Sequence, residues 1–279
     1  MSNLAPSLEL LILLAALGAG AFGALIGVGG GLIMVPLLAG VLGVDIHLAI
    51  AASLLGVIAV STVASTTYLE RGLADRRLGL TLLVATALGG IGGGYVAGLL
   101  DGRVLAGLFG LVMLLVAAQM VRGVGRPVPT PVDDPGFLEF DAAYIEPRTG
   151  ERVDYRAQRV GLGAVISLGA GALSGLLGIG GGVVNVPTLN VLMGIPIRVA
   201  TTTSTYMLGA TAAASAVIYY SRGQVDPLLA APVVLGVLVG ARVGARLATR
   251  VSQRSLQLVF AGVALLFAAQ MLWRAATGG

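Results

Sequence analysis

The sequence predicts an all-α polytopic membrane protein built from two inverted-topology repeats, each with a Gly-rich broken hairpin and three transmembrane helices. Of its 279 residues, 57% are hydrophobic and only 11% are charged. Several runs of about 20 residues carry no charge, which is the length that crosses the hydrocarbon core of a bilayer. The segment Gly27–Pro36 also recurs as Gly178–Pro187 in the pattern G-x-G-G-G-x-x-x-V-P, so the chain contains an internal repeat.

One constant offset relates the two copies without a gap. At this offset, residues 17–120 match residues 168–271 at roughly a third of their positions, including Tyr68 with Tyr219. Repeats of this kind are common in membrane transporters. We therefore divide the chain into membrane repeat 1 (residues 1–122), a charged linker (123–159) and membrane repeat 2 (160–279).

Each repeat divides into five apolar segments. The first segment resembles a signal peptide, but it lacks a basic start and recurs inside the chain, so we expect it to be mature structure. The second has 12 residues and reaches only about 18 Å at 1.5 Å per residue, so we expect it to be the return limb of a hairpin whose tip is the triple glycine. The other three are long enough to cross, which gives 8–10 membrane segments in total. The segments are 8–27, 32–43, 47–69, 78–100 and 104–122, then 160–178, 183–194, 198–220, 227–249 and 255–273.

The hairpin returns the chain to its starting side, and three further crossings leave each repeat on the opposite side, so the second copy should be inverted. Arginines test this scheme, since positive charge favours the cytoplasmic side. The scheme places eight arginines on the linker side (Arg71, Arg76, Arg77, Arg122, Arg126, Arg198, Arg250 and Arg254) and three on the other (Arg103, Arg222 and Arg274). We expect a multi-pass protein of the cell (inner or plasma) membrane with a cytoplasmic linker and both termini outside.

The linker contains five of the eleven prolines and alternating charges. This composition is typical of a solvated connector. The pieces 137–140 and 152–155 could pair as a small β-hairpin.

The triple glycines Gly29, Gly30, Gly31 and Gly180, Gly181, Gly182 allow close approach to the backbone. If short helices start near Pro36 and Pro187, their free N–H groups could bind an anion without a basic side chain. Close helix packing is the alternative use of small residues, and we assign it to Gly89, Gly92, Gly93 and Gly98. Gly18, Gly20 and Gly23 match a dinucleotide-binding pattern by accident, because no strand precedes them and the second copy has Ser174 at the third position.

The density of Ser and Thr hydroxyl groups is a second feature that is compatible with an anion-binding site. Hydroxyls can replace the water shell of an anion, or they can bond their own helix, which is commoner in membranes. Asn185 stands near the second glycine tip where the first copy has Met34, and Arg242 is the deepest charge, able either to line an anion path or to extend to the surface. With the glycine tips, the candidate substrate-binding residues are Ser53, Asn185, Thr201, Thr202, Thr203, Ser204, Thr205 and Arg242.

Other function classes lack their chemistry. The chain has no cysteine, and no nucleophile, metal cluster or paired acid and base stands at membrane depth, so we expect no enzyme, cofactor or metal. His47 begins a segment, which favours a surface role over proton transfer. Every carboxylate outside the linker falls at a segment end, so proton coupling is not evident. The expected partners are a small anion and the lipid bilayer, with no nucleic acid; a homo-oligomer is left open.

The doubled G-x-G-G-G-x-x-x-V-P element, each copy followed by a Ser/Thr-bearing helix, resembles the TauE/SafE family of sulfite and organosulfonate permeases. The resemblance covers nearly all of the chain except the long linker. It implies a permease, often an exporter, for small sulfur-containing anions such as sulfite or sulfonates. The alternatives are a permease for a carboxylate or another inorganic anion, and a structural membrane subunit without cargo.

Overall fold

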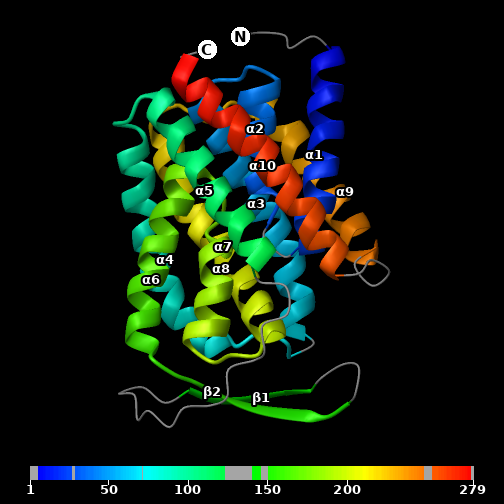
Figure 1. Ribbon diagram of the computed structural model, residues 1–279, viewed down its shortest axis with the longest axis vertical. Coiled ribbons are helices and arrows are strands. Elements are labelled where there is room, and N and C mark those ends of the chain that lie inside the picture. Colours follow the sequence, from blue (N-terminus) through cyan, green and yellow to red (C-terminus); the bar gives the residue numbers. More distant parts are fainter. Residues whose placement is uncertain are drawn as a thin grey trace.

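The computed structural model describes residues 6–26, 29–70, 72–122, 140–145, 150–247 and 253–277, which form ten α-helices and a small β-hairpin at one end of the bundle (Figure 1). Repeat 1 contains α1 (Pro6–Ile26), α2 (Gly31–Pro36), α3 (Ile46–Glu70), α4 (Arg76–Ala97) and α5 (Gly102–Arg122). Repeat 2 contains α6 (Val160–Leu177), α7 (Gly182–Pro187), α8 (Ile197–Ser221), α9 (Pro227–Leu247) and α10 (Gln253–Thr277). Two π-helical turns, η1 (Leu37–Val41) and η2 (Thr188–Leu192), continue α2 and α7, and the strands are β1 (Phe140–Ile145) and β2 (Arg152–Ala157).

The all-α membrane fold is confirmed, and each predicted apolar segment corresponds to one helix or one α-to-π continuation. Among the described residues, six helices are long and apolar enough to cross a membrane. They are Ile46–Glu70, Arg76–Ala97, Gly102–Val121, Val160–Leu177, Pro227–Gly244 and Leu258–Thr277. Many of their large apolar side chains are exposed, such as Leu115 and Val165, because the solvent for these faces is lipid and not water.

The start of α1 and the end of α10 lie at the end of the bundle opposite the linker hairpin (Figure 1). Helix α1 begins and α10 ends at one end, whereas β1 and β2 cover the other. An odd net number of crossings per repeat predicts this placement. The linker-side arginines Arg71, Arg126 and Arg250 lie outside the described residues.

The helices of one repeat pack mainly against those of the other. Helix α1 packs against α9 and α6 against α4, while α3 packs against α8 and α5 against α10. Glycines allow these close crossings, because a Cβ on Gly20 would lie 2.5 Å from the carbonyl oxygen of Val237 and one on Gly89 or Gly93 would overlap a carbonyl of α6. The packing role predicted for Gly92 is wrong, because a Cβ there would meet nothing within 4 Å.

The linker is not only a solvated connector. Strands β1 and β2 pair antiparallel, from Phe140 opposite Ala157 to Ile145 opposite Arg152; residues 137–139 of the predicted hairpin lie outside the described residues. The hydroxyl of Tyr155 donates to Oδ2 of Asp75 at 3.2 Å. Burial, together with this carboxylate, raises the pKa of the Tyr155 phenol, so the phenol stays a hydrogen-bond donor.

The buried face of the hairpin belongs to a second apolar cluster at this end of the bundle. Tyr144 of β1 and Ala157 of β2 join Leu78 of α4 and Val199 of α8 there. The larger core is formed mainly by α1, α2, α3, α5, α8, α9 and α10. The hairpin is therefore packed onto the start of α8, beside the predicted binding residues.

Candidate functional site

In each repeat the first helix and the short helix after it are joined by a turn of three glycines, and the backbone conformation explains why glycine is needed there. Gly29 and Gly30 have φ of 72° and 32°, and Gly180 and Gly181 have φ of 80° and 73°. A residue with a Cβ pays roughly 1–2 kcal/mol in this left-handed region, whereas glycine adopts it freely. The turns therefore require glycine at these positions.

The short helices begin earlier than predicted. Helices α2 and α7 start at Gly31 and Gly182, so Pro36 and Pro187 are their last α-helical residues and not the first. Proline there cannot donate to the carbonyl four residues back, and its ring crowds that carbonyl. The chain continues as a π-helix, in which bonds span five residues. The N-terminal end of each short helix consequently lies at the glycine turn itself.

The two glycine turns meet between α3 and α8. A Cβ on Gly31 would lie 2.5 Å from the carbonyl oxygen of Gly178. A Cβ on Gly180 would lie 3.1 Å from a methyl group of Val57 on α3 and 3.2 Å from one of Leu208 on α8. Both turns are buried, so four segments from two repeats converge on one small volume.

Ser53 connects the two turns. Its buried hydroxyl donates to the carbonyl oxygen of Gly178 at 2.9 Å, and the carbonyl oxygen of Gly31 lies 3.4 Å away. A hydroxyl has a single proton to donate. The hydroxyl proton of Ser53 is therefore used in a hydrogen bond that links repeat 1 to repeat 2.

Most of the hydroxyl run on α8 is also engaged in hydrogen bonds. Thr201 and Thr205 donate to carbonyls of their own helix at 2.8 Å, as hydroxyls in membrane helices often do. Thr202 donates to the carbonyl of Leu73 at 2.5 Å, and Thr203 accepts from the backbone N–H of Asp75 at 2.9 Å. These two threonines hold the α3–α4 connection onto α8.

Ser204 differs from its neighbours. Its Oγ is fully buried and has no hydrogen-bond partner among the described residues, and the same holds for Oδ1 of Asn185 and Oγ of Ser174. Ser174 was not among the predicted binding residues. Comparing the two copies position by position could have found it, because the first copy has Gly23 there.

Arg242 does not lie with the other candidate residues at the glycine turns. Its side chain is exposed on α9, on the outside of the described helices. The structure thus gathers the glycine turns, Ser53, Asn185 and Ser204, and leaves Arg242 apart from them.

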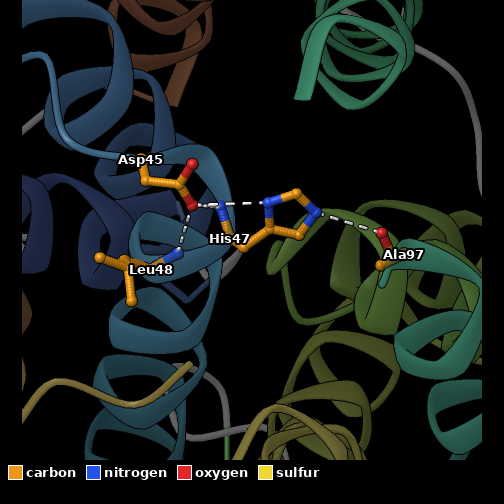
Figure 2. A network of polar contacts seen from close by, with 4 residues as sticks. All are labelled: Asp45, His47, Leu48 and Ala97. Atoms are coloured by element: carbon orange, nitrogen blue, oxygen red, sulfur yellow. Dashed lines mark hydrogen bonds and ion pairs between the residues drawn. The ribbon is translucent and has the colours of Figure 1, made fainter. Parts of the chain in front are cut away.

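His47 lies at the start of α3 (Figure 2). Its Nε2 is 3.3 Å from the carbonyl oxygen of Ala97 at the end of α4, and its Nδ1 is 3.4 Å from Oδ1 of Asp45. The Asp45 carboxylate also accepts from the backbone N–H of His47 and Leu48, which caps α3. His47 therefore joins the start of α3 to the end of α4, and its side chain is 18% exposed where the sequence predicted a surface role.

Comparison with known proteins gives four findings. The family model described as sulfite exporter TauE/SafE matches residues 12–271. A protein of Bacillus subtilis (strain 168), called probable membrane transporter protein YunE, is 28% identical over 272 residues, which is 94% of this chain and 97% of that protein. A probable membrane transporter protein of Xylella fastidiosa (strain 9a5c) is 28% identical over 254 residues, covering 90% of this chain and 89% of its own. No solved structure matches with statistical significance.

Proposed function

The chain belongs to the sulfite exporter TauE/SafE family of membrane transporters, and on this premise we propose that it carries small sulfur-containing anions, such as sulfite or organosulfonates, out of the cell. The anion binds where the two glycine turns meet. No covalent step is involved, so the protein is a permease and not an enzyme.

One observation carries the proposal: two broken helices, one from each repeat, meet at buried glycine turns beside polar atoms that have no hydrogen-bond partner in the described part of the chain. Gly31 of the first turn lies against Gly178 of the second, a Cβ on Gly182 would lie 3.6 Å from Oγ of Ser204, and the backbone N–H of Asn185 donates to the carbonyl of Gly181. Irregular backbone at membrane depth is tolerated where it is buried in protein or lines a cavity. Broken helices of this kind form the binding sites of many secondary transporters.

Alternating access follows from exchange between inverted halves. The cross-repeat packing supports this mechanism, because α1 on α9 and α6 on α4 are equivalent pairs when the two copies are exchanged. A movement that tightens one pair of this kind and loosens the other would open the site to opposite ends of the bundle.

The direction of transport rests on charge. Arg76, Arg77 and Arg198 begin helices at the hairpin end, which the positive-inside rule assigns to the cytoplasm. With the inside negative, the membrane potential favours outward movement of an anion by about 2.3 kcal/mol per charge per 100 mV. Export of a monoanion needs no coupling ion under these conditions.

Sulfite efflux from proteoliposomes tests the proposal. We expect efflux that depends on the purified full chain and accelerates when an inside-negative potential is imposed. Addition of excess methanesulfonate inside should slow it, whereas acetate should not. Efflux no faster than from protein-free liposomes would refute the function, and inhibition by acetate alone would move the substrate class to carboxylates.

A further inference from the structure

Three buried oxygen atoms gather around the second glycine turn without a hydrogen-bond partner among the described residues. They are Oγ of Ser174 on α6, Oδ1 of Asn185 on α7 and Oγ of Ser204 on α8, and none of the three residues is more than 2% exposed. A buried polar group without a hydrogen-bond partner is destabilising, and such groups are uncommon. Three of them on mutually packed helices indicate a place built for a polar ligand.

The glycine turn brings these three side chains to one place. A Cβ on Gly181 would lie 3.5 Å from Cβ of Ser174, and a Cβ on Gly182 would lie 3.6 Å from Oγ of Ser204. The backbone N–H of Asn185 donates to the carbonyl of Gly181 at 3.0 Å, so Asn185 stands one helical turn further on. Ser174 therefore lies against Gly181, Ser204 lies against Gly182, and Asn185 follows these two glycines on α7 by one helical turn.

The first turn has no equivalent cluster. The positions that correspond to Ser174 and Asn185 are Gly23 and Met34, which carry no polar side-chain atom that could bind an anion. The counterpart of Ser204 is Ser53, whose hydroxyl already donates to Gly178. The polar side chains that could bind an anion therefore lie at the second glycine turn, although the backbones of the two turns are alike.

The charge of the surroundings limits the ligand. Residues 160–197 contain no basic side chain, and Arg198 stands six residues before Ser204, about 9 Å along α8. Two hydroxyls and an amide can donate hydrogen bonds to an oxyanion, and the amide presents its NH₂ group by turning about its last side-chain bond. Without a counter-charge, the desolvation penalty rises steeply with ionic charge. A monoanion is therefore favoured over a dianion.

We propose that the second glycine turn holds one monoanionic oxyanion, such as hydrogen sulfite or a sulfonate, through Ser174, Asn185 and Ser204. The first turn supplies the opposing wall, and Ser53 supports it by holding Gly178. This inference rests on the proposed function and adds to it the donor residues, the single binding site and the charge of the substrate.

Ligand binding and transport are measured on the purified full chain with Asn185→Met, which installs the residue of the first copy, and with Ser204→Ala. The probe is methanesulfonate, read as a rise in melting temperature and as flux into proteoliposomes. We expect at least tenfold weaker binding and flux in both variants. Their melting temperature without ligand should equal or exceed that of the wild type, because an unpaired buried polar group has been removed.

Ser215→Ala serves as the matched control, since Ser215 is also buried on α8 but donates to the carbonyl of Thr211 at 3.0 Å. It should leave methanesulfonate binding within about twofold of the wild type. Equal losses in Ser215→Ala and Ser204→Ala would overturn the site assignment, as would binding that survives both Asn185→Met and Ser204→Ala.

The charge of the substrate has its own test. Methanesulfonate is a monoanion throughout, so its binding should stay constant as the pH falls from slightly alkaline to slightly acidic. Sulfite binding should strengthen over the same range because hydrogen sulfite replaces the dianion. Sulfate binding as tight as that of methanesulfonate would overturn the monoanion preference.

The outcomes separate this site from the proposed function. Wild-type sulfite efflux that is unchanged in Asn185→Met and Ser204→Ala refutes the site and leaves the transporter standing. A methanesulfonate-induced melting shift that requires Asn185, in a wild-type protein without anion flux, establishes the site and refutes transport.

Discussion

Alanine substitutions at two glycines of α1 should separate helix propensity from helix packing. Gly20 is buried against α9, where a Cβ would lie 2.5 Å from the carbonyl oxygen of Val237 and 2.6 Å from its Cα. Gly18, half a turn away on the same helix, is exposed, and a Cβ there would meet nothing within 4 Å. The two positions share the residue type, the helix and the substitution, and they differ only in what the new methyl group contacts.

The expected magnitude follows from this geometry. Favourable contacts between heavy atoms need about 3.5–4.0 Å, so Gly20→Ala forces α1 and α9 apart by about 1 Å. Overpacking of this kind costs about 1–3 kcal/mol. Replacing glycine by alanine within a helix gains about 0.8–1 kcal/mol at either site. This gain cancels between the two variants, so Gly20→Ala should be less stable than Gly18→Ala by about 1–3 kcal/mol.

Unfolding in mixed micelles measures this difference. The purified variants are titrated with SDS in a mild detergent while helix content is followed by circular dichroism. We expect Gly20→Ala to unfold at a lower SDS fraction than Gly18→Ala, and Gly18→Ala to unfold at the same SDS fraction as the wild type or a higher one. Equal unfolding curves for the two variants would show that α1 and α9 are not packed as described.

Three further substitutions test other contacts of the fold. Ser53→Ala should destabilise the protein by about 1–3 kcal/mol in the same titration, because the buried carbonyl of Gly178 loses its donor; an unchanged midpoint would argue against the link between the turns. Tyr155→Phe removes the hydrogen bond to Asp75 and should cost about 0.5–1.5 kcal/mol, with faster proteolysis of the linker; proteolysis at the wild-type rate would show that the hairpin does not depend on this bond. His47→Ala should cost about 1 kcal/mol or less, since the side chain is partly exposed and its contacts are 3.3–3.4 Å long; a loss above about 3 kcal/mol, which is typical of a broken buried network, would contradict the described role.

Much of the secondary structure could be predicted because membrane crossing fixes the length and composition of a helix. The predicted segment 183–194 corresponds to α7 and η2, and the segment 198–220 to α8. The turn at the triple glycine was predicted from the same argument, because 12 residues cannot cross alone. The predicted start of the short helices was wrong. The proline marks where α-helical hydrogen bonding changes to π-helical hydrogen bonding, and not where the helix begins.

The roles of single hydroxyls could not be predicted. Ser53 and Ser204 occupy the same position of the two copies, yet one holds the carbonyl of Gly178 and the other is unpaired. Thr203 lies beside Ser204 in the chain but accepts a hydrogen bond from Asp75, 128 residues away. A hydroxyl bonds whichever group lies within about 3 Å, and that group is supplied by a different part of the chain.

By itself, the sequence determined the placement of the apolar segments that form the helices and the family resemblance that the comparisons confirm, and it supports the two-repeat architecture as an interpretation. The tertiary structure alone decided that the two glycine turns touch, that the linker hairpin packs against α8, and that Arg242 stays apart from the turns. The physical reason is the range of the forces involved. Hydropathy and backbone propensity act along the chain and can be summed over neighbours in sequence, whereas hydrogen bonds and close packing act over a few ångströms between segments that meet only when the chain is folded.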